Sequence, residues 1–164
     1  MTHSQEGLRT RYRFSDFLFY TCLLAVPVLT AVLGILRQSV GWMVVYLVLA
    51  VAACVLLLKF FCSRCPHYTR EGKSLKCIFF WGMPKLFPPR PGPLETMDKA
   101  VSVFAAVLLL GFPLYWLVQE PGLLIVFALS TAGFAAAIRR NECSRCIYLE
   151  CPANAAPESI KQPE

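Results

Sequence analysis

The sequence predicts an all-α integral membrane protein whose four transmembrane helices form two duplicated hairpins, with cysteine-rich segments on the cytoplasmic side. The 164-residue chain is 57% hydrophobic and 16% charged, and its mean hydropathy of +0.55 differs strongly from that of soluble globular proteins. Four uncharged stretches could each cross ~30 Å of hydrocarbon, for which about 18 to 20 helical residues suffice. The tetrapeptide "CSRC" also occurs twice, 81 positions apart.

The first two apolar stretches, Phe17 to Leu36 and Gly41 to Leu58, predict the first hairpin. The link between them, Arg37 to Val40, is long enough only for a tight turn. Arginines before the first stretch could suggest a secretory signal. The apolar core is too long for a signal, and no small-residue cleavage site follows it.

The segment 59–99 that follows is too rich in Pro and Gly to form one helix. Its aromatic and large apolar residues alternate with basic ones, a composition that suits the lipid headgroup region. We expect this segment to lie on the membrane surface and cover the end of the bundle. A groove for a partner protein is the alternative interpretation. The residues concerned are Phe79, Phe80, Trp81, Met83, Leu86 and Phe87.

The second hairpin is predicted from Ala100 to Val118 and from Pro121 to Ile138, with only Gln119 and Glu120 between the two spans. The tail 139–164 contains cysteines. Beyond Cys151 it is polar and Pro-rich, so its end is expected to be disordered.

Lys and Arg residues predict the orientation of these spans. They are concentrated before the first span, in 59–99 and after the fourth span, whereas the two opposite turns together contain only Arg37. The positive-inside rule then places both termini and the central loop in the cytoplasm of a bacterium, with the spans in its inner membrane. The concentration of Lys and Arg on the cytoplasmic side and their attraction to anionic headgroups account for the net charge of +6. The charge therefore gives no reason to expect a nucleic-acid partner.

The two halves resemble each other beyond the tetrapeptide. An offset of 81 residues aligns Leu36 with Leu117, Gln38 with Gln119, Gly41 with Gly122 and Val45 with Val126. Since turn residues and cysteines match at one offset, we interpret the halves as a duplication. Two spans per half make the copies parallel, so both "CSRC" copies should emerge on the same side and could meet near a pseudo-twofold axis.

Six cysteines and one histidine are candidate metal ligands. Thiols stay reduced in the cytosol, which disfavours structural disulfides, and two CxxC pairs supply the thiolates of a tetrahedral zinc or iron site. Three arrangements are open: one site made by Cys62, Cys65, Cys143 and Cys146, two metal ions sharing six thiolates, or an iron–sulfur cluster on four of the six. The full set of candidates is Cys62, Cys65, Cys77, Cys143, Cys146, Cys151 and His67.

Four further residues have two interpretations each. Arg64 and Arg145 lie inside the CxxC pairs, where positive charge would favour thiolate, but the positive-inside rule also explains them. Cys22 and Cys54 have a similar predicted depth, roughly 8 Å, in spans 1 and 2. They could relay a soft metal ion, although a free cysteine is also an ordinary apolar residue in helix packing.

Several functions lack the residues they need. The predicted spans contain no histidine, which excludes bis-histidine haem, and no Asp, Glu, Lys or Arg for a proton relay. The chain has no phosphate-binding Gly-rich loop and no Ser/His/Asp set placed for hydrolysis. We therefore do not expect this chain to catalyse a reaction by itself.

The motifs "CSRCPHY", a following Cys, "PK" and "RPGP", then a terminal "CSRC" and "CP" resemble those of small four-span bacterial membrane proteins with no assigned activity. The resemblance covers nearly the whole chain beyond Arg13 and implies the four-span fold. Four-span protein acyltransferases also have cysteines between spans 2 and 3. This chain lacks their Asp-His-His-Cys core, which excludes that family.

The leading hypothesis is a membrane protein with a cytoplasmic thiolate metal centre, zinc or iron–sulfur, that joins the two hairpins. It would be an accessory or electron-transfer component of a larger membrane or redox complex, with the lipid bilayer as its other partner. The first alternative is a transporter or carrier of soft metal ions. The second is a membrane protein that exchanges thiols and disulfides through a CxxC pair.

Overall fold

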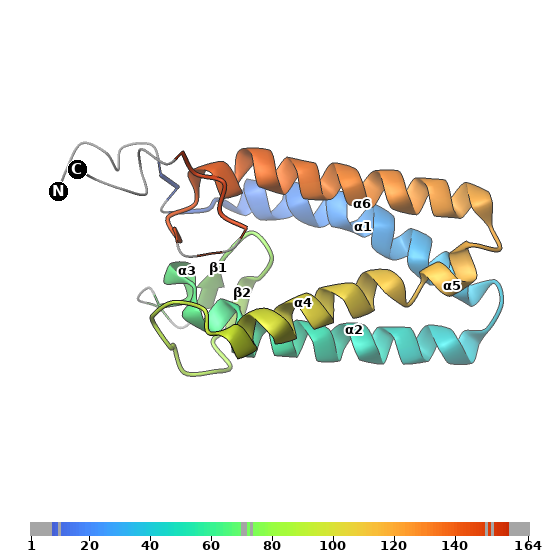
Figure 1. Cartoon of the computed structure of the whole chain (residues 1–164), viewed down its shortest axis with the longest axis horizontal. Coiled ribbons are helices and arrows are strands. Elements are labelled where there is room, and N and C mark those ends of the chain that lie inside the picture. Colours follow the sequence, from blue (N-terminus) through green and yellow to red (C-terminus); the bar gives the residue numbers. More distant parts are fainter. Residues whose placement is uncertain are drawn as a thin grey trace.

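Residues 8–9, 11–69, 72, 74–149, 151 and 153–157 are described by the computed structural model. They form a mostly helical bundle (Figure 1). Four helical segments of the described chain are long and apolar enough to cross a membrane, which confirms the prediction of four long apolar helices. The elements are α1 (Phe14–Leu36), α2 (Val40–Phe60), α4 (Thr96–Gly111) with its short continuation α5 (Leu114–Leu117), and α6 (Pro121–Asn141).

The long helices pack mainly across the two hairpins. Helix α1 lies along α6, and α2 lies along α4 (Figure 1). If α1 is matched to α4 and α2 to α6, the α1–α6 pair corresponds to the α4–α2 pair, as a pseudo-twofold arrangement requires. One buried cluster fills the bundle near the short turns, and large apolar side chains cover much of the outer surface, which suits contact with lipid. The cluster consists of Ala31, Ile35, Tyr46, Trp116, Leu117 and Phe127.

The third span is interrupted, whereas the sequence predicted one continuous run from Ala100 to Val118. Helix α4 ends at Gly111, and α5 starts again after Pro113. Proline has no N–H to donate to the preceding turn, so an interruption at this point is expected chemically. The rings of Phe112 and Trp116 pack across it, with centroids 4.9 Å apart.

The connection 59–99 contains short ordered elements and a β-hairpin that the sequence did not predict. They are η2 (Cys62–Arg64), α3 (Pro66–Thr69), β1 (Ser74–Lys76) and β2 (Trp81–Pro84), and the two strands pair antiparallel with an irregular register. The ring of Trp81 packs on Phe14 of α1, and that of Phe79 packs on Phe134 of α6. The hairpin therefore covers one end of the α1–α6 pair.

The C-terminal segment is more ordered than its composition suggests. After α6 the chain forms η3 (Cys143–Arg145). Residues 153–157, which were expected to belong to a disordered tail, make defined hydrogen bonds, and Ala156 is buried. The remaining tail, 158–164, lies outside the described residues.

Candidate metal-binding site

The two "CSRC" copies fold into the same structure at the same end of the bundle. Each follows its long helix as a single 3-10 turn, and α2 and α6 have equal lengths with both bounds 81 positions apart. The residue after each turn is extended, with φ/ψ of −70°/136° at Cys65 and −78°/132° at Cys146. The serine hydroxyls of the two copies donate equivalent hydrogen bonds, from Ser63 to the Lys59 carbonyl and from Ser144 to the Arg140 carbonyl, both 2.5 Å long.

The first group of three thiols comes from the first turn and the β-hairpin. Cys62 and Cys65 pack against a buried cluster of Leu58, Tyr68 and Leu75. Cys77 follows β1 directly, and its backbone N–H bonds the Phe80 carbonyl at 3.3 Å, which closes the tip of the hairpin. The structured loop thus adds a third cysteine to the first CxxC pair.

The second group is formed within one closed loop, 143–155. The backbone N–H of Ala155 bonds the Cys143 carbonyl at 3.0 Å. The Asn154 amide donates to the carbonyls of Cys146 and Tyr148 at 3.1 and 3.0 Å. These bonds connect the backbone around Cys143, Cys146 and Cys151, and the sequence did not indicate that Asn154 would make them.

The two groups meet between the halves of the molecule. The Cys65 thiol interacts electrostatically with those of Cys146 and Cys151 in the other half. Cys146 interacts in turn with Cys77. Tyr12, from the segment before α1, is buried beside both groups. Burial raises the pKa of the Tyr12 phenol, and the negative charge of Glu142 acts in the same direction.

Two opposing effects determine the pKa of these thiols. Burial raises the pKa of Cys65 to about 12, and it raises the pKa of Cys77, Cys146 and Cys151 as well. Backbone N–H groups that donate to the sulfurs act in the opposite direction, because they stabilise a thiolate. Without a cation in place, burial has the larger effect and the thiols remain protonated. A bound metal ion would replace those protons.

The structure places the seventh candidate, His67, beside Tyr12. His67 lies in α3, is 9% exposed, and its ring centroid is 4.8 Å from that of Tyr12. Its backbone N–H donates to the Cys65 sulfur. The structure therefore gives His67 a packing contact and a backbone contact to the first thiol group.

The thiols are gathered but do not converge on one point. Within the described part of the chain, no three His, Cys, Asp or Glu side chains are placed to hold a metal ion as they stand, and all eight cysteines are free. Cys22 and Cys54 lie exposed on α1 and α2. Cys54 is close enough to Cys62 for an electrostatic interaction.

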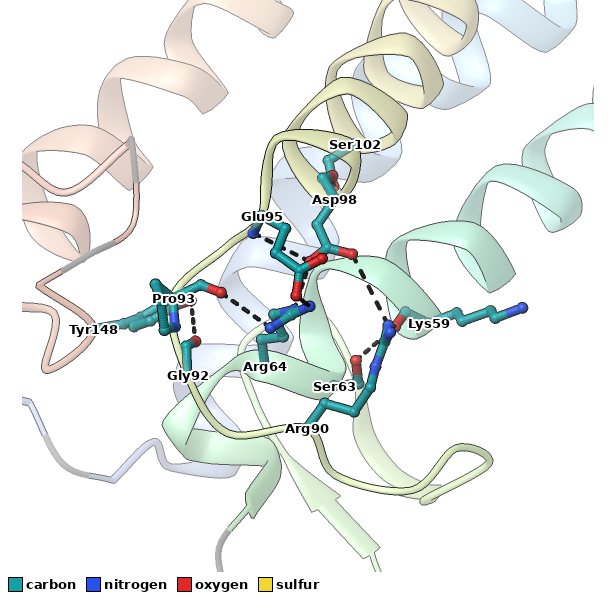
Figure 2. Close-up of polar contacts among 10 residues, drawn as sticks. All are labelled: Lys59, Ser63, Arg64, Arg90, Gly92, Pro93, Glu95, Asp98, Ser102 and Tyr148. Atoms are coloured by element: carbon teal, nitrogen blue, oxygen red, sulfur yellow. Dashed lines mark hydrogen bonds and ion pairs between the residues drawn. The ribbon is translucent and has the colours of Figure 1, made fainter.

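Arg64 binds carboxylates at the start of α4 (Figure 2). Its guanidinium approaches Asp98 at 2.5 Å and Glu95 at 2.6 Å, and it donates to the Pro93 carbonyl at 3.1 Å. Arg90 adds a bond of 2.7 Å to the Lys59 carbonyl. The first CxxC turn is therefore ion-paired to the second hairpin, a contact that the sequence did not predict.

Beside the second CxxC turn, the ion pair is formed by Glu142 and Arg9. Glu142, directly before the second "CSRC", is buried and bonds Arg9 at 2.9 Å and the Tyr20 hydroxyl at 2.9 Å. The Arg9 backbone N–H also bonds the Arg145 carbonyl at 2.6 Å. The first CxxC turn is thus attached to the start of α4, and the second is attached to Arg9 and to Tyr20 of α1, in each case across the two halves.

No protein-family model, curated protein or solved structure matches this chain.

Proposed function

We propose that this chain is a multi-pass membrane protein that holds a metal centre, zinc or iron–sulfur, through thiolates at the cytoplasmic ends of its spans. The proposal rests chiefly on one observation: the two "CSRC" copies form the same 3-10 turn after α2 and α6 and lie at the same end of the bundle. Two CxxC pairs that meet in this way supply the soft ligands that both kinds of centre require.

The surroundings of the thiols support a bound cation. Backbone N–H groups donate to the sulfurs of Cys65, Cys77, Cys146 and Cys151, and hydrogen bonds to ligating sulfurs tune metal–thiolate centres. The same surroundings disfavour thiol–disulfide exchange, since attack requires thiolate and burial raises the pKa of these groups. A centre that is fixed between four spans suits an accessory or electron-transfer role beside a larger membrane complex.

The test is metal analysis of the full chain purified in detergent without oxygen. We expect zinc or iron in a fixed ratio to protein, and its loss in a Cys65→Ser, Cys146→Ser variant. A broad visible absorption band would identify iron–sulfur, whereas zinc is silent. Metal at background level in the wild-type protein would refute the proposal.

A further inference from the structure

The two CxxC turns each carry an arginine at the equivalent place, Arg64 in η2 and Arg145 in η3. The guanidinium of Arg64 is held by two carboxylates at the start of α4, Glu95 at 2.6 Å and Asp98 at 2.5 Å (Figure 2). Only 10% of the Arg64 side chain is exposed. The arginine of the first turn is therefore fully occupied by the other half of the molecule.

Helix α1 begins as α4 does but offers one carboxylate fewer. The third residue of each helix is an aspartate that accepts the N–H of the N-cap residue, at 3.0 Å for Asp16 and 3.3 Å for Asp98. The N-cap residue itself is Glu95 in α4 and Arg13 in α1. Helix α1 therefore has no carboxylate where α4 presents that of Glu95 to the arginine of the CxxC turn.

The carboxylates beside the second turn are bound by Arg9 instead of Arg145. Arg9 lies 3.6 Å from Asp16 and 2.9 Å from Glu142, and Glu142 also accepts from the Tyr20 hydroxyl. Arg145 is exposed, and its side chain forms no hydrogen bond or ion pair within the described part of the chain. The two equivalent arginines thus differ: one is saturated, and the other has its donors available.

A cavity of about 250 Å³ lies beside Arg145, between the start of α1 and the end of α6. About 10 to 15 Å³ is enough to hold one water molecule, so a much larger group fits. The wall is mainly polar and combines donors with carboxylates that are already bound. Besides Arg145 it is formed by Arg9, Asp16, Phe19, Tyr20, Asn141 and Glu142.

The cavity lies where lipid headgroups are expected. Its residues belong to the first two turns of α1 and to the segment at the end of α6, and both helices are apolar and long enough to cross a membrane. Phe19 in the wall is 57% exposed and Leu18 beside it in the chain is 51% exposed, which offers apolar surface to acyl chains. Arg139 and Arg140, exposed in the last turn of α6, add positive charge that attracts anionic groups.

We propose that this cavity binds the phosphate group of a membrane phospholipid, with Arg145 as its principal ligand. A guanidinium binds phosphate through two parallel N–H···O bonds, and the Asn141 amide can donate a further bond. The phosphate would be to Arg145 what the Glu95 carboxylate is to Arg64. The acyl chains would lie along the exposed apolar side chains of α1.

The first experiment measures the binding of phosphatidylglycerol to the full chain, delipidated in detergent, by native mass spectrometry. We expect one lipid to bind more tightly than the rest, and Arg145→Gln to weaken that binding at least tenfold because the phosphate loses its guanidinium. Arg139→Gln is the matched control, since it removes the same charge from α6 outside the cavity, and it should bind as the wild type does. Equal weakening in the two variants, or none in Arg145→Gln, would overturn the proposal.

Two further ligands identify the group that is recognised. Diacylglycerol has the same acyl chains without phosphate and should not occupy the tight site. Inorganic phosphate at the same concentration should not displace the lipid, because it has no acyl chains to contact α1. Tight binding of diacylglycerol would show that the chains alone are recognised, and displacement by phosphate would show a site for soluble anions. Either result would overturn the proposal.

A third comparison leaves Arg145 in place. Arg13→Glu introduces at the start of α1 the carboxylate that Glu95 supplies in α4, so it should pair with Arg145 and weaken tight lipid binding at least tenfold. Arg11→Glu makes the same change of charge at an exposed position outside the cavity and should keep the tight site. Circular dichroism checks that both variants are folded. Equal binding by the two, whether retained or lost, would contradict the role assigned to Arg145. None of these results depends on metal content, so the proposed function is tested separately.

Discussion

Individual polar residues attach each CxxC turn to the rest of the bundle. The clearest example is the pair formed by Arg64 and Asp98, whose side chains are only 10% and 3% exposed. Asp98 also caps α4, because it accepts from the Glu95 N–H at 3.3 Å, and a carboxylate there interacts favourably with the helix dipole. Arg64 thus neutralises a buried charge and fixes the turn that carries Cys62 and Cys65.

Replacing Asp98 by Asn should destabilise the protein. The amide keeps an oxygen for the cap but leaves Arg64, whose side chain is 10% exposed, without its nearest counter-charge, and removing one partner of a buried pair is destabilising. Thermal unfolding in detergent, followed by circular dichroism, measures the effect as a lower Tm. Glu95→Gln is the control: Glu95 is 70% exposed, and exposed pairs contribute less than about 1 kcal/mol. Equal effects of the two variants would contradict this account.

Among the elements, α1 and α5 approach each other closely across the two halves. Gly34 of α1 lies against Leu117, and a Cβ atom at position 34 would be 2.6 Å from the Leu117 Cδ2 atom. Leu117 is fully buried, so it has little room to move. The glycine therefore permits α1 to contact α5 near the short turns, at the end opposite the cysteines.

Gly34→Leu should separate α1 from α5 and lower the Tm. Overpacking of a buried contact typically costs about 1 to 3 kcal/mol. Gly133→Leu is the matched control on α6, because no atom lies within 4 Å of a Cβ placed there, and its Tm should not fall. The variants are compared by thermal unfolding in the same detergent. A Gly34→Leu variant as stable as the Gly133→Leu variant would show that this contact is not close in solution.

In the whole molecule, all six clustered cysteines lie at one end of the bundle and the two short inter-helix turns lie at the other (Figure 1). Arg37 and Glu120 pair at 3.4 Å between those turns, which balances the charge there. Most other basic residues lie at the cysteine end or beyond it. The positive-inside rule therefore predicts that the thiols face the cytoplasm, where they would stay reduced.

This orientation predicts the outcome of labelling with a membrane-impermeant maleimide. Gln119→Cys, in the turn between α5 and α6, should be labelled in intact cells, because the predicted orientation places that turn outside. Pro157→Cys, in the exposed segment after the second thiol group, should be labelled only after the membrane is permeabilised. Mass spectrometry of the labelled peptides distinguishes these sites from the native cysteines. The reverse pattern would show that the thiols face the outside.

The sequence alone determined which segments are helical spans and which side they are expected to face. Hydropathy and charge are summed along the chain, so the apolar runs and the clusters of Lys and Arg can be read without knowledge of packing. The repeated "CSRC" also predicted that both copies lie at the same end of the bundle. The break at Pro113 had a visible local cause, although the apolar composition around it suggested one continuous helix.

Only the tertiary structure decided how the two halves join. The Arg64–Asp98 pair, the closed loop around Asn154 and the approach of Cys65 to Cys146 each connect residues that are far apart in the chain or depend on a specific backbone path. Such contacts arise when α1 packs on α6 and α2 packs on α4, and helix packing depends on side-chain shape at the contact surfaces, which composition and spacing do not encode. For the same physical reason the sequence named the six cysteines but did not predict the β-hairpin that precedes and follows Cys77 or the hydrogen bonds of Asn154 beside Cys146.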